Sequence, residues 1–211
     1  MTSVLPSPSS PLDFLASLAN EQRKTLVTKK NITNADLAVS PSLYMKALFM
    51  KTCSRMQLPI RSIKSEYVTP TATYDMEVSR AVRTCNLEQM RTLFAEGKSF
   101  DACNRFGETL LHMACRRGNI KVVKFLIFEA KVQVDVRDDF GRTVLHDACW
   151  TSRPHSEVLD VLMEVVAPEF WVTEDKRGHT PFDYVRRDHW KHWLKYLRKN
   201  QSRIVHKFTS L

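Results

Sequence analysis

The sequence has few of the features that mark membrane, secreted or redox proteins. No window approaches the ~18 consecutive apolar residues that a membrane helix needs. The richest apolar run, VVKFLIF at 122–128, is interrupted by Lys124. The five cysteines are an odd number and include no C-x-x-C pair, which favours reduced thiols over a disulfide framework. The first residues lack the basic and apolar regions of a secretory signal. These absences predict a protein of the cytosol or the nucleus.

Glycine is scarce as well, and its positions are informative. The chain of 211 residues has only five glycines, and residues 1–70 contain none. Glycine is the residue that most easily adopts a positive φ in a turn. All five lie between segments with helical patterns, so they predict turns that separate helices: Gly97, Gly107, Gly118, Gly141 and Gly178.

Charge is distributed unevenly along the chain, whose formal net charge is +9. Residues 1–70 carry nine basic and four acidic side chains, and residues 71–184 carry 15 basic and 18 acidic side chains. Residues 185–211 carry eight basic side chains and one acidic side chain. The two ends are therefore basic, while the middle is mildly acidic.

The middle of the chain repeats itself. The segment FGETLLHMACRRGNIKVVKFLI at 106–127 returns as FGRTVLHDACW at 140–150, with identical Gly, Thr, Leu, His, Ala and Cys residues 34 positions apart. A third copy opens at RGHTPFDYV, and a degenerate copy precedes residue 106. A period of 33–34 residues indicates stacked supersecondary units.

Over about residues 72–198 the chain resembles the ankyrin-repeat family, and TLLHMACRRGNIKVVKFLI is the most specific segment. A looser similarity, through LLHMACRRG and RGHTPFDYVRRDHW, is to short ankyrin-repeat proteins of diatom algae. The family resemblance implies an all-α solenoid of about four helix-turn-helix repeats with short finger turns. It also implies a non-enzymatic protein-interaction module, an adaptor or scaffold, that binds a protein partner on its concave surface.

The pattern predicts three parts. A basic, partly disordered arm covers residues 1–70 and holds a possible helix at 42–56. We expect this helix either to fold over the first, degenerate repeat or to bind a partner through its Met and aromatic side chains. The repeat domain covers 71–198, and a basic, frayed tail covers 199–211. Within the repeat domain we expect three full units and a capping unit, whose last helix spans about 181–198: 71–103, 104–137, 138–174 and 175–198.

Helix starts and outer helices can also be predicted. Thr109, Thr143 and Thr180 are expected N-caps, each followed three residues later by a polar side chain that completes a capping box. Those partners are His112, His146 and Asp183. Apolar residues at helical spacing predict the buried faces of two outer helices: Val122, Val123, Leu126 and Ile127, then Val158, Leu159, Leu162 and Met163.

The segment GRTVLHDACW places His146, Asp147 and Cys149 together, as a thiol nucleophile or a metal site would. The same His-x-x-Cys spacing occurs at His112 and Cys115, at the same phase of the repeat. Duplication indicates a packing role, in which the thiol acts as a small hydrophobic group. We therefore expect no catalytic residue, no metal site and no cofactor.

Partner-binding residues are expected at finger tips and on inner helices, because interface centres favour aromatic side chains and arginine. The predicted set is Asn104, Arg105, Phe106, Met113, Arg116, Arg117, Arg137, Asp138, Asp139, Phe140, Asp147, Trp150, Lys176, Arg177 and His179.

An alternative function is binding of nucleic acid or an acidic surface through the basic arm and the C-terminal helix. Its residues would be Arg186, Arg187, Lys191, Lys195 and Arg198, with Trp190, Trp193 or Tyr196 as stacking partners. A monomer is expected in either case.

Overall fold

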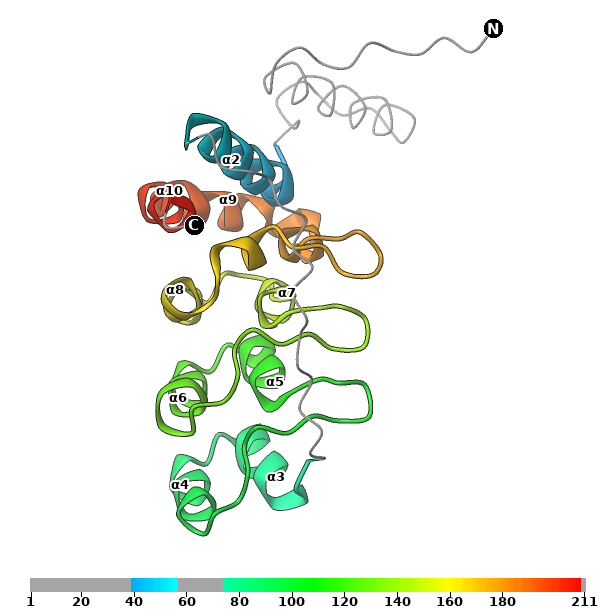
Figure 1. Cartoon of the computed structure of the whole chain (residues 1–211), viewed down its shortest axis with the longest axis vertical. Coiled ribbons are helices and arrows are strands. Elements are labelled where there is room, and N and C mark those ends of the chain that lie inside the picture. Colours follow the sequence, from blue (N-terminus) through cyan, green and yellow to red (C-terminus); the bar gives the residue numbers. More distant parts are fainter. Residues whose placement is uncertain (1–38, 57–73, 210–211) are drawn as a thin grey trace, which may run out of the picture.

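The computed structural model describes residues 39–56 and 74–209. Helical units stack along the long axis of the molecule, with inner helices in one row and outer helices in another (Figure 1). Apart from two isolated β-bridges at the bases of fingers, the described part of the chain contains no strand. The first three units comprise α3 Met76–Thr84 and α4 Leu87–Ala95; α5 Leu110–Arg117 and α6 Ile120–Lys124, extended by a π-helical turn η1 Phe125–Glu129; and α7 Val144–Cys149 and α8 Ser156–Val165.

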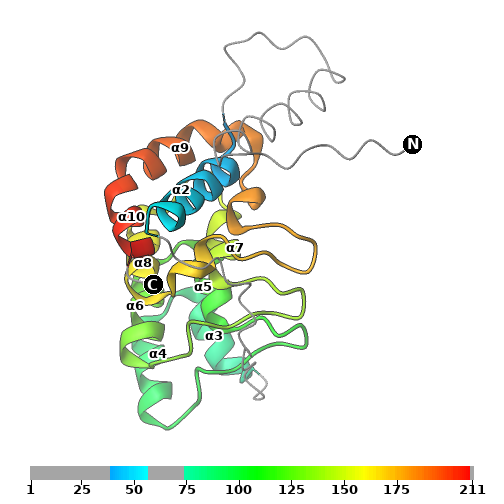
Figure 2. The same ribbon diagram turned by 45° about the horizontal axis from the view of Figure 1, so that its top comes forward.

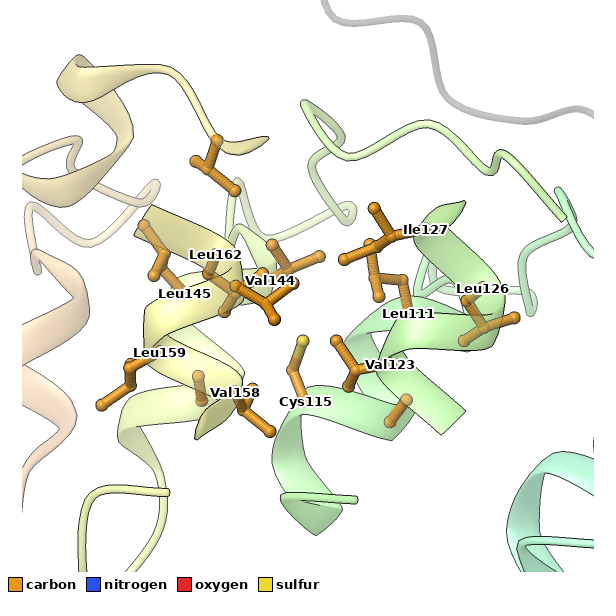
Figure 3. Packing of buried hydrophobic residues seen from close by; sticks show 14 of the residues in the cluster. Leu111, Cys115, Val123, Leu126, Ile127, Val144, Leu145, Val158, Leu159 and Leu162 are labelled. Atoms are coloured by element: carbon orange, nitrogen blue, oxygen red, sulfur yellow. The ribbon is translucent and has the colours of Figure 1, made fainter. Parts of the chain in front are cut away.

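A continuous hydrophobic core runs between the two rows. In the second and third units Leu111, Cys115 and Val123 face Val144 and Val158 across the stack (Figure 3). The predicted apolar positions of both outer helices are buried, which confirms the helical periodicity. Cys115 and Cys149 therefore serve as small core residues between stacked helices.

The last unit departs from the single helix predicted at 181–198. It consists of the 3-10 helices η3 Pro181–Tyr184 and η4 Arg187–His189 and of α9 Trp190–Lys199. The 3-10 helix η2 Pro168–Trp171 ends the preceding unit. Extended backbone at Val185 and Arg186 separates η3 from η4. The indole N–H of Trp190 donates to the Val185 carbonyl at 3.0 Å. This bond satisfies a carbonyl that a continuous helix would have satisfied.

Residues 201–209 form a helix, so the prediction of a frayed tail is wrong for this segment. Helix α10 spans Gln201–Thr209 and buries Ile204 and Phe208. The Arg203 guanidinium lies 2.8 Å from the Asp160 carboxylate of α8. Burial of an apolar face explains why a short polar sequence is helical here, because isolated helices of this length are unstable in water.

Helix α2 (Pro41–Met56) covers the opposite end of the array from the one we predicted. It packs against η3, α9 and α10 at the C-terminal end (Figure 1). Ser42 Oγ lies 3.0 Å from Thr180 Oγ1, and the Phe49 ring meets Phe208 edge to face with centroids 5.0 Å apart. The limits predicted for the arm and for the individual units stay predictions.

The two ends of the array explain this choice. At the N-terminal end, α3 exposes the charged side chains of Glu77, Arg80 and Arg83, together with Met76. At the C-terminal end, α9 and α10 carry Trp193 and Phe208, which are fully buried when α2 is docked. Solenoids need polar outer faces at both ends. Here the first end is polar by sequence, and a helix from earlier in the chain covers the second.

Candidate functional site

Three fingers project from the same side of the array beside the inner helices (Figure 2). Each begins with an Asx turn, in which one side-chain oxygen accepts two backbone N–H groups. Asn104 accepts from Phe106 and Glu108 at 2.9 and 3.1 Å. Asp138 and Asp175 do the same in the next two fingers. The recurrence of Asn or Asp three residues before Gly therefore specifies each turn.

Consecutive fingers are joined into a ledge. The backbone N–H of Asp139 donates to the Phe106 carbonyl, and that of Lys176 donates to the Phe140 carbonyl, both at 2.9 Å. The glycine after each tip has a positive φ, 71° at Gly107. A Cβ at Gly107 would lie 2.9 Å from an Asp139 carboxylate oxygen, so the close approach of two fingers also requires glycine here. We call the three finger tips and the adjoining sides of α5, α7 and η3 the finger surface.

The predicted capping boxes at Thr109, Thr143 and Thr180 are confirmed. The Thr143 N–H donates to His146 Nδ1 at 3.0 Å. The ring's Nε2 lies 3.0 Å from the His179 carbonyl, and the equivalent nitrogen of His112 lies 3.2 Å from the Arg142 carbonyl. Both nitrogens of each ring are therefore engaged, and each histidine ties an inner helix to the following finger.

This geometry accounts for the His–Cys pairs without catalysis. Burial lowers the pKa of His112 and of His146 to about 4. Burial also raises the pKa of the Cys149 thiol well above its ordinary value, and the side chain is inaccessible to solvent. A reactive cysteine needs a lowered pKa and access to its target. The arrangement at Cys149 has the properties of a packing position.

Aromatic side chains are exposed on the finger surface. Phe106 and Phe140 are each 44% exposed, and their ring centroids lie 6.4 Å apart. The Arg105 guanidinium carbon lies 4.7 Å from the Phe106 centroid, and that of Arg142 lies 5.2 Å from the Phe140 centroid. The two fingers thus present two neighbouring aromatic rings, each held by a cation–π contact with an arginine of its own finger.

A second aromatic pair lies further along the surface. Trp150, which is 56% exposed, lies 5.4 Å from Tyr184 between ring centroids. Tyr184 donates its hydroxyl proton to Asp175 and meets the His179 ring edge to face. Tyr184 was missing from the predicted set. It occupies the repeat position of Met113 and Asp147, so the alignment of repeats was the signal that could have found it.

Two of the predicted contact residues are buried, and that part of the prediction is wrong. Asp138 is bound by Arg142 within its own finger. Asp147 accepts from Arg116, whose guanidinium also pairs with Glu108. Burial raises the pKa of Asp147 to about 6, although Arg116 and Arg142 oppose this shift. Both carboxylates hold arginines in place, and both are buried away from the surface that a protein partner could contact.

The other predicted residues lie in three settings. Asn104 and Met113 are half-buried. Arg117 and Arg137 donate to the backbone carbonyls of Arg83 and Glu174. The exposed remainder at the finger tips consists of Arg105, Asp139, Lys176, Arg177 and His179.

Removal of the Arg116 side chain is expected to destabilise the protein in a pH-dependent way. In Arg116→Ala the buried Asp147 carboxylate loses its main partner, so the free energy of unfolding at pH 7 should fall by about 2 kcal/mol. At pH 5 the carboxyl is protonated and most of the loss should disappear. Urea unfolding at both pH values measures the change. Arg117→Ala is the matched control, and equal losses for both variants at both pH values would contradict this account.

Similarity to known protein families agrees with the fold. A family profile described as ankyrin repeats (3 copies) matches residues 78–174. Residues 78–174 are ankyrin repeats. Ankyrin repeats are generally protein-interaction modules.

Two relatives match parts of the chain. A putative glutaminase 2 from Caenorhabditis elegans is 35% identical over 78 residues, which cover 37% of this chain and 13% of the relative. The BCL-6 corepressor-like protein 1 from Homo sapiens is 41% identical over 58 residues, which cover 28% of this chain and 3% of the relative. The chain thus matches only a small part of each relative's length. Within residues 39–56 and 74–209 no helix is long and apolar enough to span a membrane, and no metal-binding cluster of three or more His, Cys, Asp or Glu residues is found.

Proposed function

We propose that this ankyrin array is a non-enzymatic adaptor that binds a protein partner on its finger surface. The observation that carries the proposal is the set of exposed aromatic rings at Phe106, Phe140 and Trp150. Large aromatic side chains and arginines contribute most of the binding energy in protein interfaces. The odd number of cysteines and the lack of a C-x-x-C pair support the cytosol or the nucleus as the place of action.

The surface is organised for binding before a partner arrives. Hydrogen bonds between fingers fix the ledge, and the His146 ring ties α7 to the third finger. The Arg116 guanidinium is held by two carboxylates while remaining 39% exposed. Side chains held in this way lose little conformational entropy on binding. The array can therefore present a fixed pattern of aromatic and cationic groups.

Replacement of the exposed aromatic residues is expected to abolish partner capture. Full-length chain carrying Phe106→Ala, Phe140→Ala and Trp150→Ala should lose at least about 2 kcal/mol of binding energy, or roughly 30-fold in affinity. Affinity purification with quantitative mass spectrometry identifies the captured proteins, and titration with the purified partner measures the loss.

The chain offers a matched control on the outer helices. Phe94 and Phe128 are 42% and 50% exposed, so Phe94→Ala and Phe128→Ala remove two aromatic rings of similar fractional exposure from the outer helices. The control variant should retain the partners. Loss of the same partners from both variants, or from neither, would contradict binding at the finger surface.

A further inference from the structure

The C-terminal end of the array carries a cationic stripe opposite its packed face. Helix α9 buries Trp193, Leu194, Tyr196 and Leu197. Its exposed cationic residues are Lys191, Lys195, Arg198 and Lys199, at positions i, i+4, i+7 and i+8. Residues at this spacing share one side of a helix. Arg186 and Arg187, in the turn before the helix, are exposed as well.

These charges are not neutralised within the described part of the chain. No carboxylate of residues 39–56 or 74–209 forms an ion pair with a cationic side chain of residues 186–199, and Asp188 is the single acidic residue of that segment. By contrast, some arginines elsewhere, such as Arg116 and Arg203, pair with carboxylates. Helix α2 packs against α9 and adds exposed Lys51 and Arg55 to the same end.

We infer that this stripe, consisting of Arg186, Arg187, Lys191, Lys195, Arg198 and Lys199, binds the phosphate backbone of double-stranded nucleic acid without reading its sequence. A row of cations about 12 Å long can contact several consecutive phosphates, because a helix rises about 1.5 Å per residue. Release of condensed counterions from the duplex then provides the binding free energy.

The aromatic residues favour a duplex over a single strand. Single-strand binders stack bases on exposed rings. Here Trp193 is fully buried and Tyr196 is 8% exposed. Trp190 is half-buried, and its indole N–H is engaged by the Val185 carbonyl. The stacking partners expected from the sequence are thus mostly unavailable, which leaves phosphate contacts as the mode of binding.

The same exposed residues argue against a lipid surface. Interfacial helices insert an apolar face below the headgroups. The exposed residues of α9 are Lys191, His192, Lys195, Arg198 and Lys199, and none of them is apolar. The apolar face of α9 is already packed against the protein.

The test uses the full chain and a fluorescently labelled random-sequence DNA duplex of about 20 base pairs in about 50 mM salt, where screening is weak. The variant Lys191→Gln, Lys195→Gln, Arg198→Gln should weaken binding about tenfold or more and reduce the slope of log K against log salt by about 3. The matched control Lys121→Gln, Lys124→Gln, Arg153→Gln removes the same charge from exposed positions elsewhere and should change affinity less than about twofold.

Three results would overturn the inference. One is no duplex binding by the unaltered chain at low salt. Another is an equal loss in both triple variants, because bulk charge would then explain the binding. The third is tighter binding to phosphatidylserine vesicles than to the duplex with the same dependence on the α9 residues, because the stripe would then be a membrane contact.

Discussion

Replacement of Phe208 by alanine should lower the free energy of unfolding by about 3–5 kcal/mol, the range for a large aromatic side chain removed from a core. The ring is fully buried and meets Phe49 of α2 edge to face. Its loss leaves a cavity between two helices that lie far apart in the sequence. Equilibrium unfolding in urea, followed by circular dichroism, measures the change.

Phe128→Ala provides the control, because the same atoms are removed from a side chain that is 50% exposed. That substitution should change stability by less than about 1 kcal/mol. A small effect of Phe208→Ala, similar to that of Phe128→Ala, would mean that α10 does not pack in solution and that the frayed tail predicted from the sequence was right.

The packing of α2 also affects how partner experiments must be designed. Truncation to residues 71–211 would remove α2 and uncover Phe208, whose ring meets Phe49. It would also remove the contacts of Ser42 with Thr180 and of Lys46 with Glu174, at the two ends of the third finger. A loss of binding after truncation would therefore mix partner recognition with damage to the finger surface. Point variants in the full chain avoid this ambiguity.

The repeat domain was predictable because its signals are local and duplicated. The Thr–His capping boxes, the finger glycines and the apolar periodicity each recur at a fixed spacing, so each copy supports the others. The burial of the outer-helix residues and the positive φ at Gly107 and Gly141 follow from these patterns. The phase of Phe106, Phe140 and Trp150 in the repeat placed them among the candidate contact residues, and all three side chains are exposed.

The remaining features depend on contacts between distant segments. Nothing in residues 42–56 alone indicates whether that helix covers the first or the last unit, because the choice depends on which end leaves apolar side chains uncovered. Burial of Asp147 depends on Arg116, 31 residues earlier. A carboxylate in that helical position is normally expected to face solvent. The sequence could not show that an arginine from the preceding unit reaches it.

Acidification from pH 6.5 to 4.5 should lower the free energy of unfolding by about 3 kcal/mol. The folded-state pKa of His112 and of His146 is about 4, against an ordinary value of 6.5. Below pH 6.5 the unfolded chain therefore binds two protons that the folded chain excludes. Stability is lost as pH falls through this window, because protonation favours the state that binds more protons.

Asp147 acts in the opposite sense. Its folded pKa of about 6 exceeds its ordinary value of 3.8, so between these values the folded chain holds a proton that the unfolded chain has released. The net difference over most of the window is about one proton, which corresponds to about 1.4 kcal/mol per pH unit. Asp147→Asn removes the opposing group. The free energy of unfolding should then fall more steeply with decreasing pH, with a slope that corresponds to a difference of about two bound protons.

The double variant His112→Gln, His146→Gln supplies the decisive comparison. Its stability should be lower at every pH, because the two contacts from the ring Nε2 atoms to the carbonyls of the following fingers are lost. Gln at the third helical position can still complete each capping box. Its pH dependence, however, should be flat or reversed between pH 6.5 and 4.5, since Asp147 then dominates. Urea unfolding at half-unit intervals of pH measures how the free energy of unfolding depends on pH in the unaltered chain, in Asp147→Asn and in the double variant. Parallel slopes for the unaltered chain and the double variant would show that these histidines are not the groups that couple protonation to folding.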